Sequence, residues 1–447
     1  MNTSTAIDHE NMHKKLGWHT LGQAFDCACG QKHALPIQAC HIGPGAARHL
    51  AAFARELGWS RCLVVSDENT RASDGDTLVR ALRDAGIRPA EKQFADAPLE
   101  ATDGAAKVVG EAGAEEDGYV ALGGGTLSDL AKSAGDAQGK PVLLYPTAAS
   151  MNGYTSAIVA LKVNGLKRTL PCAPALGIFA DPALAAAAPG RMAAAGLADF
   201  LSKASSAADW QAAHLLRGAY YCARPREFCE GIQDALLNAA PAVGKGESEA
   251  IEILLKALML SGFGMVVAGS SAPASGGEHL ISHYLDMKHA LDGTPNDLHG
   301  IQVGVATVHT LTLWRRILES DPASIDPAVL AANQPAPALV KEAIMEDWGP
   351  RVGGEVLLQW QQKSLDPKSV EAELALFVQR LPEIRERLSE DLLPSETVAR
   401  AIQEAGGPPT PDGMMASKAE YRKALRNARF LRNRFTVLDL EAELGID

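Results

Sequence analysis

The chain has 447 residues, of which 47% are hydrophobic and 21% charged. Because a single hydrophobic core seldom grows beyond about 250–300 residues, this length predicts two domains. The formal net charge of -12 argues against a nucleic-acid partner, which would need a basic surface to displace counterions. A small anionic ligand is not excluded, because a helix N-terminus and one or two basic side chains suffice to bind a phosphate.

Neither a signal peptide nor a membrane span is expected. Residues 1–18 are polar and lack the apolar core of a signal peptide. The longest apolar run, around residues 257–269, is interrupted by Ser261 and three glycines, and it falls short of the ~20 residues that a span needs. We therefore expect a cytoplasmic protein.

Seven cysteines are spread along the chain, and this odd number does not favour a disulfide framework. Cys27, Cys29 and His33, followed by Cys40 and His41, resemble a metal-binding cluster. The C-x-C spacing differs from the usual C-x-x-C of zinc ribbons. A β-hairpin with a glycine turn and buried thiols is the alternative, and the sequence leaves both open.

Up to residue 185, short apolar runs alternate with helical patterns. The runs are flanked by polar residues or closed by proline, as buried parallel strands are. The expected strands are 61–66, 118–122 and 141–146, and the expected helices are 45–57, 77–86 and 127–137. This alternation predicts a doubly wound α/β domain over residues 1–185.

Past residue 185, Ala- and Leu-rich segments recur at helical spacing without a comparable strand-like run. Glycine and proline interrupt them at 293–295 and 406–409. The expected helices are 191–216, 231–242, 247–268, 277–290, 299–317, 327–345, 370–389, 395–405 and 416–430. Residues 186–447 are therefore predicted to form an all-helical domain.

Three glycines, 123–125, stand between an expected strand and an expected helix. Glycines let the backbone approach a pyrophosphate, and the helix N-terminus offers free N–H groups. The motif is not G-x-G-x-x-G, so a tight turn without a ligand is the alternative, although ligands of open α/β sheets bind at this edge. Asp67, just past the first strand, either accepts a hydrogen bond from an adenosine ribose, which favours NAD over NADP, or caps a helix.

The helical half contains a candidate set of metal ligands. Asp199 lies among apolar neighbours, His279 and His283 share one helix face, and His299 opens another apolar segment. A carboxylate with two imidazoles is a common ligand set for a catalytic divalent cation with an open position. The alternative for each residue is a satisfied place in the core, the commoner role of a single histidine among apolar residues.

Two blocks carry a resemblance to a known family: residues 145–156 (Tyr-Pro-Thr-Ala-Ala-Ser-Met-Asn-Gly-Tyr-Thr-Ser) and residues 274–283. The chain resembles the sn-glycerol-1-phosphate dehydrogenases, in particular their bacterial branch. That family belongs to the superfamily of dehydroquinate synthases and iron-containing alcohol dehydrogenases. The resemblance covers about residues 25–315, and a C-terminal segment at 421–440 also resembles the family. It implies a Rossmann-like α/β domain followed by an all-α domain, the dehydroquinate synthase-like fold.

The resemblance also implies roles for particular residues. Gly124, Gly125, Thr126 and Asp129 would hold the dinucleotide, with Thr147, Ser150 and Ser156 lining its cleft and Asp67 at the ribose. Asp199, His279 and His299 would bind the metal. His283 and Asp199 would be catalytic, and both would contact the substrate together with Asn152. The implied cofactors are NAD or NADP and one divalent metal, zinc first, with nickel and iron as alternatives.

One position departs from the family pattern. The family normally carries Asp after Ser-Met or Ser-His, and this chain has Asn152. Asparagine keeps the shape and an acceptor but cannot take a proton. The exchange points to a related polyol phosphate as the substrate or to a different chemistry, or else it is a neutral change in a polar contact.

The expected function is the interconversion of dihydroxyacetone phosphate and glycerol 1-phosphate, or of a related polyol phosphate, in phospholipid metabolism. The candidates for the phosphate are Lys162, Lys167, Arg168 and Lys203, whose alternative role is a solvated surface. A cyclase like dehydroquinate synthase is one alternative function, although Asp199 stands where that enzyme's site has Glu. A second alternative is an NAD-binding sensor or scaffold with little activity. The resemblance suggests a homodimer or a larger homo-oligomer.

Overall fold

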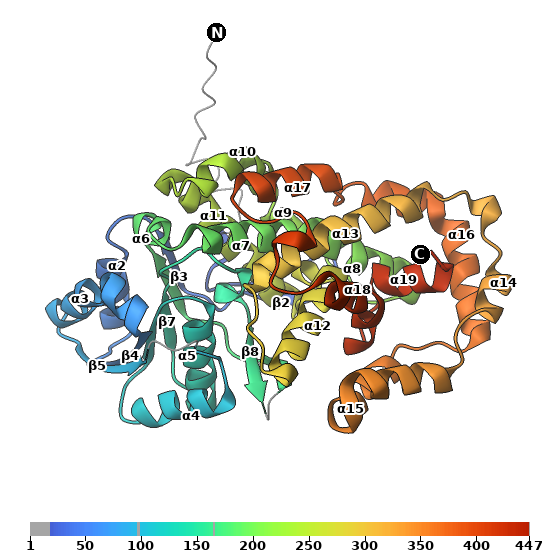
Figure 1. Cartoon of the computed structure of the whole chain (residues 1–447). Coiled ribbons are helices and arrows are strands. Elements are labelled where there is room, and N and C mark those ends of the chain that lie inside the picture. The colour runs from blue at the N-terminus through green and yellow to red at the C-terminus, as the bar shows by residue number, and fades with distance from the viewer. Residues whose placement is uncertain (1–17, 96–98, 164–165, 447) are drawn as a thin grey trace, which may run out of the picture. The chain divides into compact units, whose positions relative to one another are not determined.

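The computed structural model describes residues 18–95, 99–163 and 166–446 (Figure 1). The polar lead-in expected at the N-terminus therefore lies, up to residue 17, outside the described residues. The chain forms two compact units that alternate along the sequence. The first unit comprises Met1–Leu161, Thr169–Ala193 and Cys222–Ser270, and the second comprises Lys162–Arg168, Ala194–Tyr221 and Ser271–Asp447. The single domain boundary expected after residue 185 stays a prediction.

A six-stranded parallel sheet forms the centre of the first unit. Its strands are β3 (Ala39–Ile42), β4 (Arg61–Asp67), β5 (Arg88–Phe94), β6 (Tyr119–Leu122), β7 (Val142–Tyr145) and β10 (Gly177–Ala180). Their order is β3-β10-β7-β6-β4-β5, and every neighbouring pair is parallel. Leu63 lies opposite Tyr119, which in turn lies opposite Val142. The three apolar runs expected from the sequence are therefore central strands.

Helices cover both faces of this sheet. They are α2 (Ala46–Glu56), α3 (Glu68–Asp84), α4 (Asp103–Ala112) and α5 (Gly125–Gln138). The first two share a buried core with alternate strand residues, Cys62 and Val64 among them. The other two pack against each other, and α5 contacts β4, β6 and β7. Figure 1 shows the two pairs on opposite sides of the sheet, which confirms the doubly wound α/β arrangement.

Three strands of the sheet and one of two small hairpins were not expected, and the other hairpin is the glycine-turn alternative considered for Cys27 to His33. The edge strand β5 reads Arg-Pro-Ala-Glu-Lys-Gln-Phe and has no fully buried residue, so it shows no apolar run. Strand β3 also has no buried residue, and β10 is a strand of four buried residues. The hairpins pair β1 (Ala24–Asp26) with β2 (Lys32–Ala34) and β8 (Ile158–Val163) with β9 (Leu166–Pro171).

The first unit also contains four helices from further along the chain: α6 (Pro182–Ala186), α9 (Arg224–Phe228), α10 (Ile232–Gly244) and α11 (Ser248–Ala268). With 21 residues, α11 is longer than the apolar run considered above, and it is apolar enough to cross a membrane. However, 89% of its apolar window is buried inside the protein. It packs against α6, α9 and α10, so α11 is a core helix.

The second unit is built from helices around one core. After α7 (Gly190–Leu201) come α8 (Lys203–Arg217), α12 (Gly277–Asp292), α13 (His299–Glu319), α14 (Pro327–Ala332), α15 (Pro337–Gln361), α16 (Pro367–Leu388), α17 (Ser395–Glu404), α18 (Lys418–Asn427) and α19 (Val437–Leu444). Trp314 and Phe377 are fully buried in this core. The helix expected at 327–345 is divided into α14 and α15, because Pro337 begins a new helix. The predicted fold class is confirmed.

Candidate functional site

The glycine turn lies at the carboxyl end of β6, where α5 begins. Gly123 has φ +152°, and a Cβ there would lie 2.3 Å from Leu127 Cδ1. A Cβ on Gly125 would lie 2.7 Å from Met151 Sδ. Among the described residues, a Cβ on Gly124 would meet no atom within 4 Å. The backbone at Gly124 is therefore open to a ligand, whereas the positive φ of Gly123 favours glycine and a side chain at Gly125 would require Met151 to move.

A second loop follows β7, the neighbour of β6 in the sheet. It passes through η2 (Asn152–Thr155), in which Asn152 is 8% exposed. The buried Lys132 donates to the carbonyl oxygens of Gly153, at 3.2 Å, and Ile158, at 2.7 Å. The contact of Met151 with Gly125 brings the two loops together. The predicted cofactor residues at 124–126 and 147–156 thus lie at one edge of the sheet.

Several of the predicted cofactor residues make internal hydrogen bonds. Asp67 Oδ1 accepts from the Thr70 backbone N–H at 2.7 Å and caps α3, the alternative role considered above. Asp129 Oδ2 accepts from the Ala160 N–H at 3.0 Å. The hydroxyl of Ser156 donates to the Gly153 carbonyl, and that of Ser150 lies 3.2 Å from the Tyr154 hydroxyl. Their roles toward a cofactor, and those of Thr126 and Thr147, stay predictions.

The three predicted metal ligands lie together in the second unit. Asp199 comes from α7, His279 from the first turn of α12, and His299 is the first residue of α13. One ligand atom from each residue lies within 4.8 Å of the others. His279 Nε2 is 3.4 Å from Asp199 Oδ1, and the two imidazole rings are 5.1 Å apart. Asp199 and His279 are almost fully buried.

Neighbouring groups orient both imidazoles. Glu278 Oε1 accepts hydrogen bonds from His279 Nδ1 at 2.9 Å and from the Gly276 backbone N–H at 2.7 Å. Since a carboxylate only accepts, the proton is on Nδ1 and Nε2 faces Asp199. His299 Nδ1 lies 3.0 Å from the Ser282 hydroxyl. Partners of this kind fix the tautomer and the ring orientation of metal-binding histidines.

The two imidazoles differ in basicity. Burial opposes protonation of His279, but hydrogen bonds to Asp199 and Glu278 outweigh it and raise its pKa to about 9. Burial, together with the charges of Lys167 and His279, lowers the pKa of His299 to about 4. At neutral pH a proton therefore lies between His279 and Asp199, where a divalent cation would replace it.

His283 lies one turn after His279 on α12. Its ring stacks on that of His299, with centroids 5.8 Å apart and planes 13° apart. Burial, followed by the charges of Arg432 and His299, lowers its pKa well below the usual range, so it is neutral at neutral pH. Among the described residues, its Nδ1 has no hydrogen-bond partner. An imidazole able to exchange a proton thus lies beside the candidate metal ligands.

Several charged groups near this site were not predicted, Asp286 and Arg432 among them. Asp286 is buried and forms an ion pair with Lys167, and its Oδ2 lies 4.0 Å from His299 Nδ1. Burial raises the pKa of Asp286, but the charges of Lys167 and His299 lower it overall. The sequence contains a signal for Asp286, which lies three residues after His283 on the same helix face. Arg432 lies in the C-terminal segment, residues 421–440, that resembles the family.

The candidate phosphate ligands differ in their environments. Lys203 is buried and donates to the Pro273 carbonyl at 3.2 Å. Arg168 pairs with Glu355 at 2.6 Å. Lys167 is close enough to His299 and His283 to lower the pKa of both. Lys167 therefore lies beside the candidate metal site.

Comparison with known proteins gives several sequence relatives. A family model described as iron-containing alcohol dehydrogenase matches residues 41–189. The glycerol-1-phosphate dehydrogenase, NAD(P)+, of Halalkalibacterium halodurans is 32% identical, with 65% of this chain and 74% of that protein covered. The enzyme of the same name from Natronomonas pharaonis is 34% identical, with 65% and 83% covered.

Solved structures are similar in fold at lower sequence identity. The maleylacetate reductase of Agrobacterium tumefaciens has a TM-score of 0.57 at 17% identity, with 88% of this chain and 89% of that chain covered. The glycerol dehydrogenase of Schizosaccharomyces pombe has a TM-score of 0.52 at 17% identity, with 92% of each chain covered. At these identities the likeness concerns the fold.

Proposed function

The chain belongs to the glycerol-1-phosphate dehydrogenase family, and from this membership we propose an NAD(P)-dependent, metal-dependent dehydrogenase. The proposed reaction interconverts dihydroxyacetone phosphate and glycerol 1-phosphate or a related polyol phosphate. The observation that carries the proposal is the grouping of Asp199, His279 and His299 within 4.8 Å, with His283 stacked beside them. These residues offer a divalent-metal site and an acid–base group in one place.

The donor set fits a catalytic divalent cation. Asp199, His279 and His299 offer one carboxylate oxygen and two imidazole nitrogens, and three protein ligands leave a coordination position for the substrate. Zinc, nickel and iron all accept such a set, so the identity of the metal stays open. When bound, the cation polarises the substrate carbonyl as a Lewis acid, and NAD(P)H supplies the hydride.

His283 is the proposed proton relay. At neutral pH its imidazole is unprotonated, and it is therefore available to accept the hydroxyl proton when the alcohol is oxidised. In the reverse direction it must carry a proton. A substrate phosphate would offset the charges of Arg432 and Lys167 that lower its pKa, and would favour this protonated form. We therefore propose that Lys167 and Arg432 bind the phosphate.

The first unit is proposed to hold the dinucleotide at the carboxyl ends of β6 and β7. The open backbone at Gly124 and the N-terminus of α5 suit a pyrophosphate. The capping role of Asp67 does not distinguish NAD from NADP. None of the seven cysteines forms a disulfide, which supports a reducing compartment such as the cytoplasm. A homo-oligomer is proposed from the family resemblance.

The proposal is tested by following nicotinamide absorbance with dihydroxyacetone phosphate and other polyol phosphates, in the presence of zinc, nickel or iron. We expect net NAD(P)H oxidation with dihydroxyacetone phosphate. Release of inorganic phosphate without net oxidation would identify a cyclase instead. Tight cofactor binding without turnover of any substrate would support a sensor or scaffold.

The variant Asn152→Asp tests the substrate within this proposal. If glycerol 1-phosphate is the native substrate, we expect the rate with dihydroxyacetone phosphate to change by less than about tenfold, or about 1.4 kcal/mol in the barrier. A larger gain would show that the native substrate is a different polyol phosphate, because the restored carboxylate would then have changed the specificity.

A further inference from the structure

A small hairpin near the N-terminus of the first unit contains few backbone pairs that could stabilise it. Strands β1 and β2 have three residues each and pair Phe25 with His33. In the turn, the Gly30 N–H donates to the Cys27 carbonyl at 2.9 Å, and Gly30 has φ +83°. This is the hairpin with a glycine turn considered in the sequence analysis. An isolated two-stranded hairpin is marginally stable in water, so further interactions must hold it.

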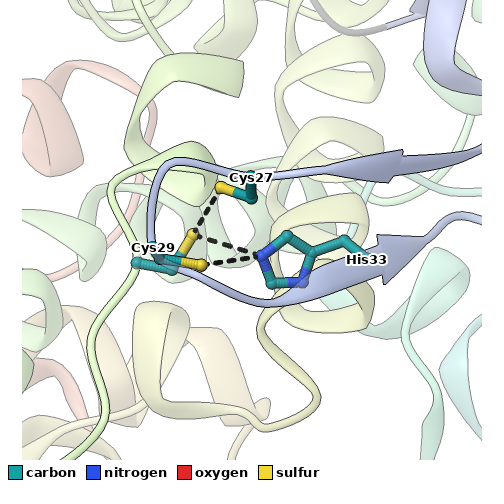
Figure 2. A group of neighbouring side chains, drawn as sticks. Cys27, Cys29 and His33 are labelled. Carbon is teal, nitrogen blue, oxygen red and sulfur yellow. Dashed lines mark hydrogen bonds between the residues drawn. The ribbon is translucent and has the colours of Figure 1, made fainter.

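The turn gathers three potential metal ligands, and a fourth comes from a distant segment. Figure 2 shows Cys27, Cys29 and His33 pointing toward one another at the end of the hairpin. Cys222, two residues before α9, joins them although it is 195 residues away from Cys27 in sequence. One ligand atom from each of the four residues lies within 4.8 Å of the others. His33 and Cys222 are buried.

Three of the six distances among these atoms lie within about 0.3 Å of the edges of a zinc tetrahedron. Zn–S bonds of about 2.3 Å and Zn–N bonds of about 2.0 Å imply S–S edges of about 3.8 Å and S–N edges of about 3.5 Å. Cys27 Sγ is 3.7 Å from Cys222 Sγ. His33 Nε2 is 3.5 Å from Cys222 Sγ and 3.2 Å from Cys29 Sγ. A disulfide would instead require sulfurs at about 2.05 Å.

The surroundings suit a closed structural site. The Phe25 ring lies 5.7 Å from the His33 ring, and the Arg224 guanidinium lies 5.8 Å from the Phe25 ring. An aromatic ring thus lies beside the His33 imidazole. Three sulfurs and one imidazole are soft ligands that favour zinc over magnesium or calcium. Four protein ligands fill a tetrahedral shell and leave no position for a substrate.

We propose that Cys27, Cys29, His33 and Cys222 form a structural zinc site that fastens the β1–β2 hairpin to the segment preceding α9. All four ligands belong to the first unit, and none of them is a candidate active-site residue. The site stabilises the fold of the first unit and takes no part in the dehydrogenase reaction. It is independent of the proposed function.

Cobalt substitution in the full-length protein distinguishes this site from the active site. Thiolate ligands give Co²⁺ an intense sulfur-to-metal charge-transfer band in the near ultraviolet, and Asp199, His279 and His299 offer no sulfur. We expect the band in the wild type and in His279→Ala, and its loss in Cys222→Ser. The matched control is Cys172→Ser, a half-buried cysteine outside the cluster, which should keep the band.

Zinc content provides the second measurement. Cys222→Ser and His33→Ala should each lose one equivalent of zinc per chain relative to the wild type. His33→Cys should keep it, since four thiolates also bind zinc. If these zinc-deficient variants fail to fold, the wild-type protein still tests the proposal. A mercurial thiol reagent should release one equivalent of zinc from it. A folded wild type without the charge-transfer band and without thiol-released zinc would overturn the proposal, as would a Cys27–Cys222 disulfide found by peptide mass.

Discussion

Among the described residues, two clusters of potential metal ligands differ in ligand number and chemistry. In the first unit, three cysteines and one histidine come from a hairpin and one distant segment. In the second unit, one aspartate and two histidines come from three helices. Four protein ligands close a tetrahedral shell, whereas three leave a position for a substrate. The number and type of ligands therefore fit the proposed structural role of the first cluster and the proposed catalytic role of the second.

The elements that carry the two clusters also differ in how firmly they are packed into the fold. His279 and His299 lie on α12 and α13, which pack on each other in the core of the second unit. Those helices are held by buried side chains whether or not a metal is bound. The hairpin that carries Cys27 and His33 has only two short strands. Loss of the metal from the second unit should therefore abolish catalytic activity. Loss of the metal from the first unit should lower the stability of its fold.

The largest effect is expected for His279→Ala. Activity should fall by about a thousandfold or more, because the Lewis-acid contribution of several kcal/mol is lost with the metal. The circular dichroism spectrum should stay unchanged. The control is His289→Ala, a buried histidine on the same helix. Full metal content and turnover in His279→Ala would remove the basis for a catalytic site here.

A smaller loss is expected for His283→Asn. If His283 is the proton relay, kcat should fall by about 10²–10⁴-fold while bound metal is retained. The limb of the pH–rate profile that reports this imidazole should also disappear. Steady-state rates across pH, together with metal analysis, test both points. Loss of metal in this variant would make His283 a ligand instead of a relay.

Glu278→Gln tests the group that orients His279. Removal of a partner of this kind weakens metal binding by about 10–100-fold. Titration of the metal-free protein with buffered zinc measures the affinity, and excess zinc should restore most of the activity. Wild-type affinity in this variant would show that Glu278 does not position the ligand.

The smallest effect concerns the pH dependence of stability in the second unit. Arg217 binds both Glu373, at 2.7 Å, and Glu443, at 3.0 Å. Burial, followed by the charge of Glu373, raises the pKa of Glu443 from 4.5 to about 9. The folded state therefore holds an extra proton between these values, and the free energy of unfolding should fall as pH rises through this window.

Glu443→Gln should flatten this dependence, because glutamine stays neutral throughout. Thermal midpoints of the wild type and the variant at pH 6 and pH 9 measure the difference. We expect the variant to lose less stability than the wild type between these two pH values. Parallel changes in the two proteins would place the pH dependence elsewhere.

The sequence predicted those elements whose residues form a recognisable local pattern, such as an apolar run. Strand β4 lies inside a sheet covered on both faces, so its residues form a continuous apolar run. The edge strand β5 has polar, partly exposed residues and leaves no such pattern. The grouping of Asp199, His279 and His299, which the structure brings together, was expected from the family resemblance. Cys222 has no local pattern linking it to Cys27, and only the folded chain brings them together.

The most direct measurement is the rate of NAD(P)H oxidation with dihydroxyacetone phosphate, before and after metal is restored to the metal-free protein. We predict no turnover without metal. With metal, one NAD(P)H should be oxidised for each glycerol 1-phosphate formed. Equal turnover by the metal-free protein, or phosphate release without net oxidation of NAD(P)H, would contradict a metal-dependent dehydrogenase.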